Sequence, residues 1–571
     1  MPAALTGAIL NDLERLRYCF ARVDAARVAK ALARAGAASY DDVPSLIRFH
    51  EALLVLRAFP SNAAVLRRAE RYLSTFWQRV ERLRKAGADM DDFDPLEVSG
   101  IAGTTMQDAL GFDLARWLVK RLPGKVEIAW DDFDDERALG AVWPRLMPLL
   151  EEDTLAEANI PWRKWLESAQ GNSSKSPAWL IDRFAALPLS EAEKGRLYDS
   201  LHMPIRWRLE NSRISRTRNS RPVAQVFYHD GPLIPRPDVS LAAELARRPP
   251  ALRRLSRSKG ESIMDLIREV MLVRYRELYG TTLGDPRSVV HAEVGRGVSI
   301  HLWNLPAERR LPLRAYVAGL TLKNGAPINY IEAIGLFEWI EVGFNTFYTF
   351  RGGEVAWTFA QVLRCLCHFT GATCISMYPY QLGHNNEEAI ESGAFWFYRK
   401  LGFRPGRADL LRLVEREEAR IARNPKYRTP SRTLRRLAEG HAFYELPGEE
   451  AGAWDRFSTR NIGLQVNRRM AAEFGGSLAH FQNASVRSLA KVLRTRTPAD
   501  DMLRKSFENF ALVAALIPDL RSWSTMEKED LLQIIRAKSG TDEMRYLHLL
   551  QAHGRLRDAM LRVGSKTLLL E

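Results

Sequence analysis

Cysteine is scarce in this sequence. Its 571 residues include four cysteines, Cys19, Cys365, Cys367 and Cys374. Four thiols are too few for a disulfide framework in a chain of this length, which favours a reducing compartment. Cys365 and Cys367 are one residue apart within a helical pattern, so their side chains point to different sides of that helix. No His and Cys residues at zinc-ligand spacing complete them, so we expect no metal site.

Long apolar runs are also lacking. No window approaches the ~18 uninterrupted apolar residues of a transmembrane helix. The segment 1–20 has no basic start, its apolar run is short, and charges follow at once, which is not the pattern of a secretory signal. We therefore expect no membrane insertion and a cytoplasmic location.

Calcium loops are missing from the two acidic clusters at 89–94 and 131–135. An EF-hand loop needs a Gly at its sixth position and a Glu at its twelfth. The sixth positions here are Asp94 and Glu136. The clusters therefore indicate solvated loops or helix starts.

Basic residues, by contrast, are abundant. The formal net charge is +14 and the pI is about 9.6. Such an excess favours an anionic partner, namely nucleic acid, an anionic membrane surface or a phosphate-bearing cofactor. The alternative is a well-solvated, Arg-rich surface. The basic residues concentrate in segments 206–259 and 412–436, which are the candidates for binding nucleic acid.

The length suggests about three domains, at roughly 100–200 residues each. Apolar residues at helical spacing dominate both ends of the chain, and a β-rich stretch lies in the middle. We therefore divide the chain into a helical N-terminal domain (1–175), a basic connecting segment (176–250), an α/β domain (251–410) and a helical C-terminal region (411–571). The expected fold class is α/β (α+β), with a mixed β-sheet and flanking helices set between large, mostly helical regions.

Within the central part, the apolar period changes from helical to alternating. An amphipathic helix is expected at 261–279. β-Branched and aromatic residues then predict strands at 298–305, 314–322, 327–337 and 343–350. The Asn324-Gly325 pair between two of these runs predicts a hairpin. The predicted order continues with a helix at 354–370, a strand at 372–380, and a helix at 391–403 ending at Gly402.

A Gly-rich turn joins the strand at 343–350 to the following helix, and it has the features of an anion site. Arg351, Gly352 and Gly353 precede Glu354, Val355 and Ala356 at the expected helix start. Backbone N–H groups at a helix start are free to bind an anion, and the helix dipole adds about half a positive charge. Arg351 could add a charge-assisted hydrogen bond to phosphate. A plain turn before a helix is the alternative.

A second motif follows one helix and one strand later. The segment 394–403, AFWFYRKLGF, resembles the A-x-x-x-Y-x-K-x-G-F signature that closes the acetyl-CoA site in the GNAT acyltransferase superfamily. The upstream Asn-Gly hairpin resembles the second and third GNAT strands, and residues 252–270 resemble the opening strand and first helix. The resemblance covers residues 252–405 and implies a GNAT-like mixed sheet.

The resemblance also implies roles for individual residues. Backbone amides of residues 352–356 would cradle the pyrophosphate of acetyl-CoA or another acyl-CoA, which serves as co-substrate. The strands at 343–350 and 372–380 would splay and bind the pantetheine arm. Tyr398 would protonate the leaving CoA thiolate, and an amine-bearing small molecule, peptide or protein would accept the acyl group. The alternative for Tyr398 is a packed helix aromatic.

A general base is also needed, because the attacking amine must lose a proton. The superfamily often places a carboxylate on the strand before the pyrophosphate loop, where Glu341 and Glu338 are nearest and Glu332 lies behind them. An insertion at 379–390 adds His384 near the expected transfer point. The alternative for this insertion is a capped helix start, with Asn386 as the cap.

The turn departs from the family pattern [Q/R]-x-x-G-x-[G/A]. Arg351 and Ala356 fit that pattern, but Glu354 stands where Gly is expected. A carboxylate there would repel a pyrophosphate unless it turns away. Gly352 and Gly353 could supply flexibility in a shifted register.

Two functions therefore compete. The first is an enzyme that moves an acyl group from acyl-CoA to an amine, with a variant whose donor is aminoacyl-tRNA held by the basic flanks. The second is a non-catalytic GNAT-like module that binds nucleic acid or a protein partner through the basic segments. Tyr398 and the Gly402-Phe403 pair favour the first, and Glu354 favours the second.

Overall fold

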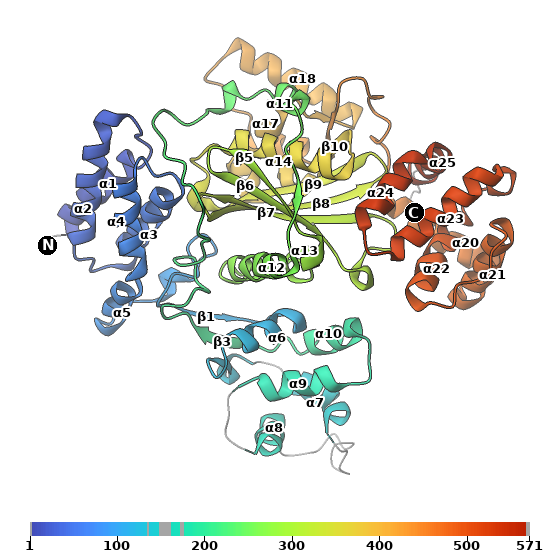
Figure 1. The fold of residues 1–571 in the computed structure, drawn as a ribbon, viewed down its shortest axis with the longest axis horizontal. Helices are drawn as coiled ribbons and strands as arrows, with labels where there is room; N and C mark the ends of the chain where they lie inside the picture. Colours follow the sequence, from blue (N-terminus) through green and yellow to red (C-terminus); the bar gives the residue numbers. More distant parts are fainter. Residues whose placement is uncertain (1–2, 134–135, 148–160, 172–175, 567–571) are drawn as a thin grey trace.

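A nine-stranded mixed sheet lies at the centre of the protein (Figure 1). The computed structural model describes residues 3–133, 136–147, 161–171 and 176–566. The strand order is β11-β12-β10-β9-β8-β7-β6-β5-β4. Among the described strands only β9 and β10 pair in parallel, and all other neighbours are antiparallel. The expectation of a mixed α/β fold is therefore confirmed.

The strands of this sheet come from one continuous part of the chain. They are β4 (Arg253–Arg254), β5 (Val290–Gly295), β6 (Val298–Asn304), β7 (Ala315–Lys323), β8 (Ala326–Leu336), β9 (Trp339–Thr346), β10 (Cys374–Met377), β11 (Arg404–Pro405) and β12 (Ala442–Glu445). The predicted hairpin joins β7 to β8, where Asn324 and Gly325 have φ values of 47° and 80°. Positive φ at both central residues is what a tight hairpin turn requires.

The parallel pair ends in a fork. β9 and β10 are in register from Trp339 and Cys374 to Val342 and Met377. β10 then stops, because Pro379 lies in the first turn of the short helix α15 (Pro379–Leu382). β9 runs on to Thr346 with only β8 beside it, so the two strands that are neighbours below the fork have separate paths above it.

Two expected strand boundaries were wrong at this fork. Residues 343–350 were expected to form one strand, but β9 ends at Thr346 and Tyr348–Phe350 forms a 3-10 helix. Phe347 and Phe350 are buried in the core shared with the N-terminal helices, which ends the pleat. The strand expected at 372–380 likewise ends at Met377.

Helices cover both faces of the sheet. On one side lies α14 (Val355–Thr370), which packs on Val317, Ile331 and Val342; we call this the α14 face. On the other side lie α12 (Arg257–Leu272) and α13 (Tyr279–Thr282), whose neighbours include Ala318 and Leu320; we call this the α12 face (Figure 1).

The N-terminal helices form a bundle that shares the core of the α12 face. They are α1 (Ala3–Leu16), α2 (Ala25–Ala37), α3 (Val43–Ala58), α4 (Ala63–Ser74) and α5 (Trp77–Lys85). This bundle also reaches the turn before α14, where Thr349 donates a hydrogen bond to Glu51 of α3. The N-terminal helices are therefore part of the wall around that turn.

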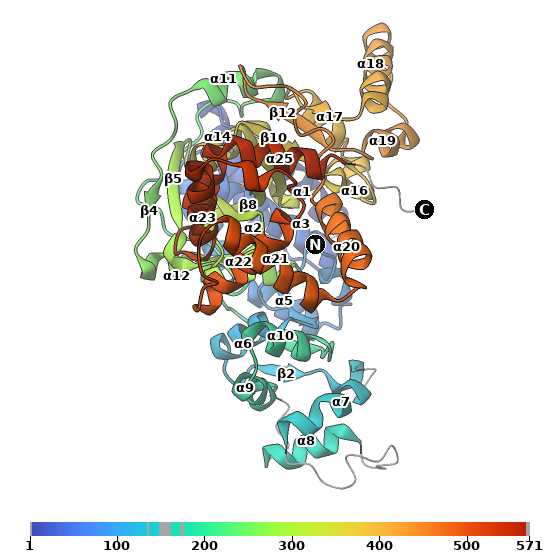
Figure 2. The ribbon, with the colours of Figure 1, turned by 90° about the vertical axis from the view of Figure 1, so that its right-hand side faces the viewer.

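A smaller domain projects below the sheet and has a core of its own (Figures 1 and 2). Its elements are β1 (Thr105–Asp108), α6 (Phe112–Arg121), β2 (Val126–Ile128), α7 (Glu136–Leu146), α8 (Trp162–Gln170), α9 (Ala178–Ala186), α10 (Glu191–Asp199) and β3 (Ile205–Arg208). The three strands form a sheet of order β1-β3-β2. This core draws on both sides of the domain boundary that was expected at residue 175, and it includes strands in a segment expected to be helical.

The C-terminal part both completes the sheet and extends beyond it. Helices α16 (Glu387–Glu391), α17 (Ala394–Arg399), α18 (Ala408–Arg423) and α19 (Ser431–Leu437) precede β12, so the sheet continues past the boundary expected at residue 410. A helical region follows, with α20 (Thr459–Phe474), α21 (Leu478–Val492), α22 (Asp501–Ala514), α23 (Thr525–Ser539), α24 (Glu543–Ala552) and α25 (Gly554–Gly564). The buried pair Lys538–Glu543, at 3.1 Å, lies beside Arg310 at this junction.

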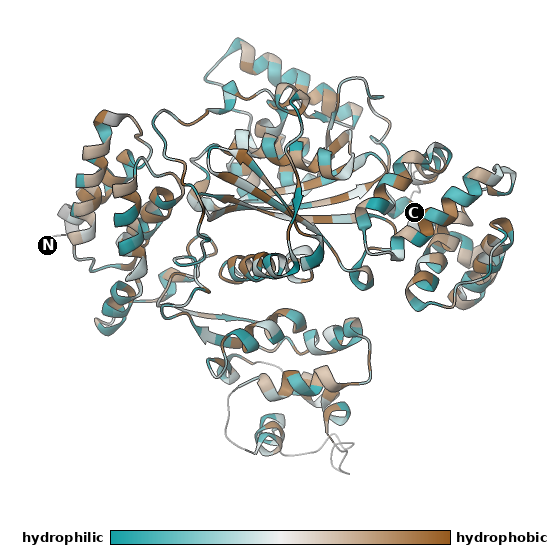
Figure 3. Cartoon of the chain, in the orientation of Figure 1, coloured by the Kyte–Doolittle hydropathy of each residue, from teal (hydrophilic) through white to brown (hydrophobic). Residues whose placement is uncertain are grey.

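The helices alternate hydrophilic and hydrophobic residues along their length (Figure 3). Apolar residues gather on the faces that pack against neighbouring elements. In the described part of the chain, no helix has the length and apolar character needed to cross a membrane.

Candidate functional site

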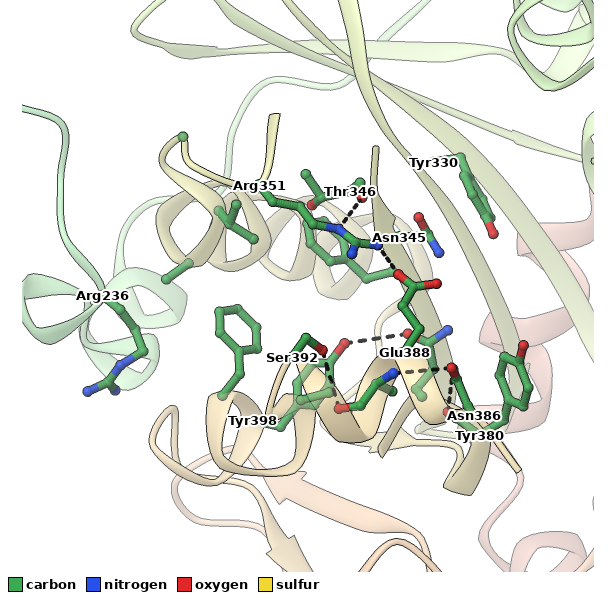
Figure 4. A pocket seen from close by; sticks show the side chains of 18 of the residues that line it. Arg236, Tyr330, Asn345, Thr346, Arg351, Tyr380, Asn386, Glu388, Ser392 and Tyr398 are labelled. Atoms are coloured by element: carbon green, nitrogen blue, oxygen red, sulfur yellow. Dashed lines mark hydrogen bonds and ion pairs between the residues drawn. The ribbon is translucent and has the colours of Figure 1, made fainter. Parts of the chain in front are cut away.

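A pocket of about 420 Å³ occupies the fork between β9 and the end of β10 (Figure 4). Its walls come from β8, β9, the turn before α14, helices α15 to α17, and the loop before α11 (Leu241–Ala246). The residues that line the pocket include Arg236, Arg276, Tyr330, Phe344, Asn345, Thr346, Arg351, Gly353, Val355, Ala356, Tyr380, Gln381, Asn386, Glu388 and Tyr398.

Side chains from both faces of the sheet line the pocket. Phe344 projects onto the α14 face, where its ring lies 4.9 Å from that of Phe359. Asn345 is opposite Tyr330 in the register of β8 and β9, and Tyr330 belongs to the core of the α12 face. Successive strand residues point to opposite faces, so a molecule lying along β9 would contact both.

The N-terminus of α14 supplies backbone donors at one wall. Thr358 N–H donates to the Glu354 carbonyl at 2.9 Å, which is the first bond of the helix. The N–H groups of Val355, Ala356 and Trp357 therefore have no partner within the helix, and the helix dipole is positive here. Val355 and Ala356 line the pocket, so this wall favours an anion.

Glu354 turns away from the pocket. Its side chain is 2% exposed and pairs with Arg296, with Lys323 Nζ at 3.5 Å. Ile234 N–H donates to it at 3.1 Å. Burial alone would raise the pKa of Glu354, but the Arg296 hydrogen bond and the Lys323 charge outweigh it and the pKa is lowered. The carboxylate is thus neutralised behind the turn and does not face an anion in the pocket.

The glycines of the turn have a packing role. A Cβ at Gly353 would lie 2.7 Å from Phe59 Cζ, and one at Gly352 would lie 3.0 Å from the Tyr18 hydroxyl. Both partners belong to the N-terminal bundle and the residues beside it. Glycine therefore lets this turn pack closely against the helices, a reason that the sequence motif alone did not indicate.

Arg351 faces the pocket and pairs with Glu388 of α16 (Figure 4). Its guanidinium also lies 3.9 Å from the Tyr348 ring centroid. Asn386 caps α16 by accepting a hydrogen bond from Ala389 N–H at 3.2 Å, as one of the two alternatives for the insertion predicted. His384 is exposed and lies outside the pocket lining.

Tyr398 lies in the pocket wall on α17. Its ring packs against Phe359, Phe397 and Phe403. The hydroxyl is 3.5 Å from Gln381 Oε1, at the outer limit of a hydrogen bond. Burial raises the pKa of Tyr398, so the hydroxyl keeps its proton at neutral pH. Tyr398 is therefore both a packed aromatic residue of its helix and a residue of the pocket wall.

The two carboxylates that the sequence offered first as general bases have different surroundings. Glu338 accepts hydrogen bonds from Trp454 and Arg557, each at 2.7 Å, and lies away from the pocket. Glu341 is 2.8 Å from His441 Nε2 and 3.6 Å from Arg314. Neither lines the pocket, but Glu341 projects from β9 two residues before Gly343, on the same face.

Glu332 on β8 is placed directly opposite Gly343 by the strand register. Its partner is the Tyr316 hydroxyl, which donates to it, and within the described residues it has no cationic partner. Burial raises the pKa of Glu332, and the Tyr316 hydrogen bond only partly offsets that effect. The sequence placed this residue behind Glu341 and Glu338, because strand pairing is not visible in a single sequence.

The basic segments differ in how far their charges are paired. In 206–259, several arginines form ion pairs with carboxylates, namely Arg206, Arg208, Arg216, Arg247 and Arg257. In 412–436, the structure shows ion pairs for Arg420, Arg435 and Arg436. Arg412, Arg416, Arg423 and Lys426 are exposed and lack a carboxylate partner among the described residues.

No group of three or more His, Cys, Asp or Glu side chains that could hold a metal is found in the described ranges. Comparison of the chain with protein-family models, with curated proteins and with solved structures gives no match.

Proposed function

We propose that the protein is a GNAT-like N-acyltransferase, which moves an acyl group from acyl-CoA to an amine. The observation that carries this proposal is the fork, where a parallel strand pair separates and a pocket of about 420 Å³ fills the opening. The pocket joins an anion-favouring helix start to a buried tyrosine hydroxyl. A long ligand with phosphates at one end and a thioester at the other fits this arrangement.

The donor would lie along β9. Its pyrophosphate would accept hydrogen bonds from the free N–H groups at the start of α14, with Arg351 and Arg236 nearby. Its pantetheine arm would follow the backbone of residues 343–346, where β9 has lost β10 as a partner. The burial of Glu354 behind the turn removes the repulsion that its position in the motif suggested.

The reaction would need one base and one acid. The neutral amine nitrogen attacks the thioester carbonyl carbon, a C–N bond forms and the C–S bond breaks. Glu332 accepts the proton that the attacking nitrogen loses, directly or through water, and Tyr398 donates its hydroxyl proton to the leaving thiolate. The products are an amide and free CoA thiol, and the two residues exchange the proton back through solvent.

Glu332 suits the base role better than Glu341. The carboxylate of Glu341 is already engaged, with His441 Nε2 at 2.8 Å and Arg314 at 3.6 Å. Glu332 has no cationic partner among the described residues, and burial raises its pKa above the ordinary value of a carboxyl group.

The test is calorimetry and turnover with acetyl-CoA and longer acyl-CoAs. We expect saturable binding, and we expect Tyr398→Phe to lower turnover by about a hundredfold with little change in CoA affinity. Tyr198→Phe is a matched control, because Tyr198 is also buried but lies in the small domain. The absence of binding to any CoA ester, or unchanged turnover in Tyr398→Phe, would refute the proposal.

The second candidate is a module that binds nucleic acid. It is favoured by the exposed cations of α18, a helix that stands out from the body (Figure 2). Electrophoretic shift with RNA and DNA at two salt concentrations tests it, since phosphate contacts weaken as salt rises. Binding that is absent or insensitive to salt would exclude this role.

A further inference from the structure

We infer that the acceptor is an amine that also carries an anionic group, held between Glu332 and Arg276 on the α12 face. This inference rests on the proposed acyl transfer and names the class of its second substrate. Arg276 lines the pocket, and Glu332 projects onto the same α12 face just outside the pocket lining. The two opposite charges do not pair with one another.

Arg276 is the cation of the pair. It follows α12, lines the pocket and donates a hydrogen bond to the Tyr330 hydroxyl at 3.1 Å. No carboxylate lies within ion-pair distance of it in the described part of the chain, whereas Arg351 is paired with Glu388. A partly buried guanidinium that lines a pocket and has no described carboxylate within ion-pair distance is suited to bind an anion from solution.

Glu332 is the anion of the pair, and the strand residue opposite it has no side chain. Gly343 lies opposite it, and a Cβ built at Gly343 would have only Glu332 atoms within 4 Å, the nearest at 3.7 Å. The missing side chain therefore leaves room beside the carboxylate on the α12 face. An amine placed there would be next to the residue that removes its proton and next to the fork.

Tyr330 links the two charges. It lies on β8 two residues before Glu332, on the same face, and its hydroxyl contacts Arg276. Two strand residues span about 7 Å along the backbone, so the side chains of Tyr330 and Glu332 are neighbours on this face. Burial raises the pKa of Tyr330, while Arg276 acts to lower it and Glu332 to raise it, so both charges lie within reach of this hydroxyl. The acceptor would lie beside Tyr330, between the two charges.

The experiment measures kcat/KM of the full-length chain, with acetyl-CoA as donor, for pairs of acceptors that differ in one anionic group. In the carboxylate pairs, ω-amino acids of increasing length are each compared with the corresponding uncharged amide. In the phosphate pair, phosphoethanolamine is compared with ethanolamine. We expect the anionic member of at least one pair to have a kcat/KM at least about tenfold higher than its neutral partner. Arg276→Met should abolish that preference, and Arg276→Lys should restore part of it.

A second variant tests the space beside Glu332. Gly343→Ala adds a Cβ at ordinary contact distances, so the protein should fold, while KM for the acceptor should rise by a larger factor than the dissociation constant of CoA. Equal use of anionic and neutral acceptors, with CoA still bound and consumed, overturns this inference alone. No binding of acetyl-CoA overturns the proposed function and this inference with it.

Discussion

Glu332 is the residue whose titration the proposed chemistry depends on. Burial raises its pKa above the ordinary 4.5, so the carboxylate becomes a base only above that pH. We expect kcat/KM to fall as pH is lowered through an apparent pKa above 4.5, and we expect Glu332→Gln to lower kcat by about a hundredfold or more. Glu341→Gln is the control and should have a smaller effect.

Glu332 should also lower the free energy of unfolding at neutral pH. Because its folded pKa is raised, native Glu332 contributes more favourably when protonated, and that contribution is lost as pH rises from 4.5 through the folded pKa. Glu332→Gln should therefore raise the unfolding free energy at neutral pH while lowering activity, with the gain vanishing below pH 4.5. A variant that is both less active and less stable at neutral pH would contradict the assignment.

Glu354 has the opposite role, since it stabilises the turn. Its removal leaves Arg296 and Lys323 near one another without their carboxylate. We expect Glu354→Gln to lower the unfolding free energy by about 3 kcal/mol, measured by urea titration. The pKa of Glu354 is lowered, so its contribution is present above pH 4.5 and is lost as pH falls through the folded pKa.

Glu261→Gln is the control for that measurement. Glu261 forms an exposed pair with Arg257 at 2.9 Å, and such pairs contribute about 1 kcal/mol or less. If the two variants lose the same stability, Glu354 does not neutralise a buried cluster in the way described.

At the scale of elements, α16 holds a contact that competes with a bound anion. Glu388 pairs with Arg351 and also bonds the Tyr348 hydroxyl. A phosphate at Arg351 has to displace this carboxylate. Both side chains are partly exposed, so the pair is worth up to about 1 kcal/mol, and Glu388→Gln should tighten CoA binding by up to about fivefold in calorimetry. Weaker binding in this variant would show that Glu388 supports the site.

The elements themselves could be predicted from the sequence, because alternation and helical period are local. The hairpin at Asn324-Gly325, the helix α14 and the cap at Asn386 are where the residues predicted them. The strand ends could not be predicted, because Phe347 turns into a core built partly by the N-terminal helices.

The site could be predicted only in part, for the same reason. Tyr398 and Arg351 both line the pocket, but Glu338 is held by Trp454 and Arg557 from distant segments. Strand register alone puts Glu332 opposite Gly343. These side-chain contacts and this strand register depend on tertiary structure, so no local sequence pattern predicts them.

At the scale of the whole molecule, the small domain is an insertion. Leu209 N–H donates to the Thr104 carbonyl at 2.9 Å, so the two ends of the inserted segment lie side by side. We expect replacement of residues 105–208 by a short Gly-Ser linker to leave a folded protein whose affinity for CoA, measured by calorimetry, is unchanged.

A wider excision of residues 99–219 is the matched comparison. It also removes Arg216, which is buried 3.7 Å from Glu51 of α3, and Thr217, which bonds His50 at 2.9 Å. We expect this second protein to unfold or aggregate, because it leaves buried polar groups of α3 without partners. Loss of folding in the narrower excision would show that the small domain is not separable.

The central claim is that the fork binds the donor, and a crystal structure of the full-length chain with CoA tests it most directly. The account predicts the pyrophosphate at the N–H groups of residues 355–357, the pantetheine arm along residues 343–346, and Arg351 released from Glu388 onto phosphate. CoA bound at another surface, or a fork left empty at saturating CoA, would contradict it.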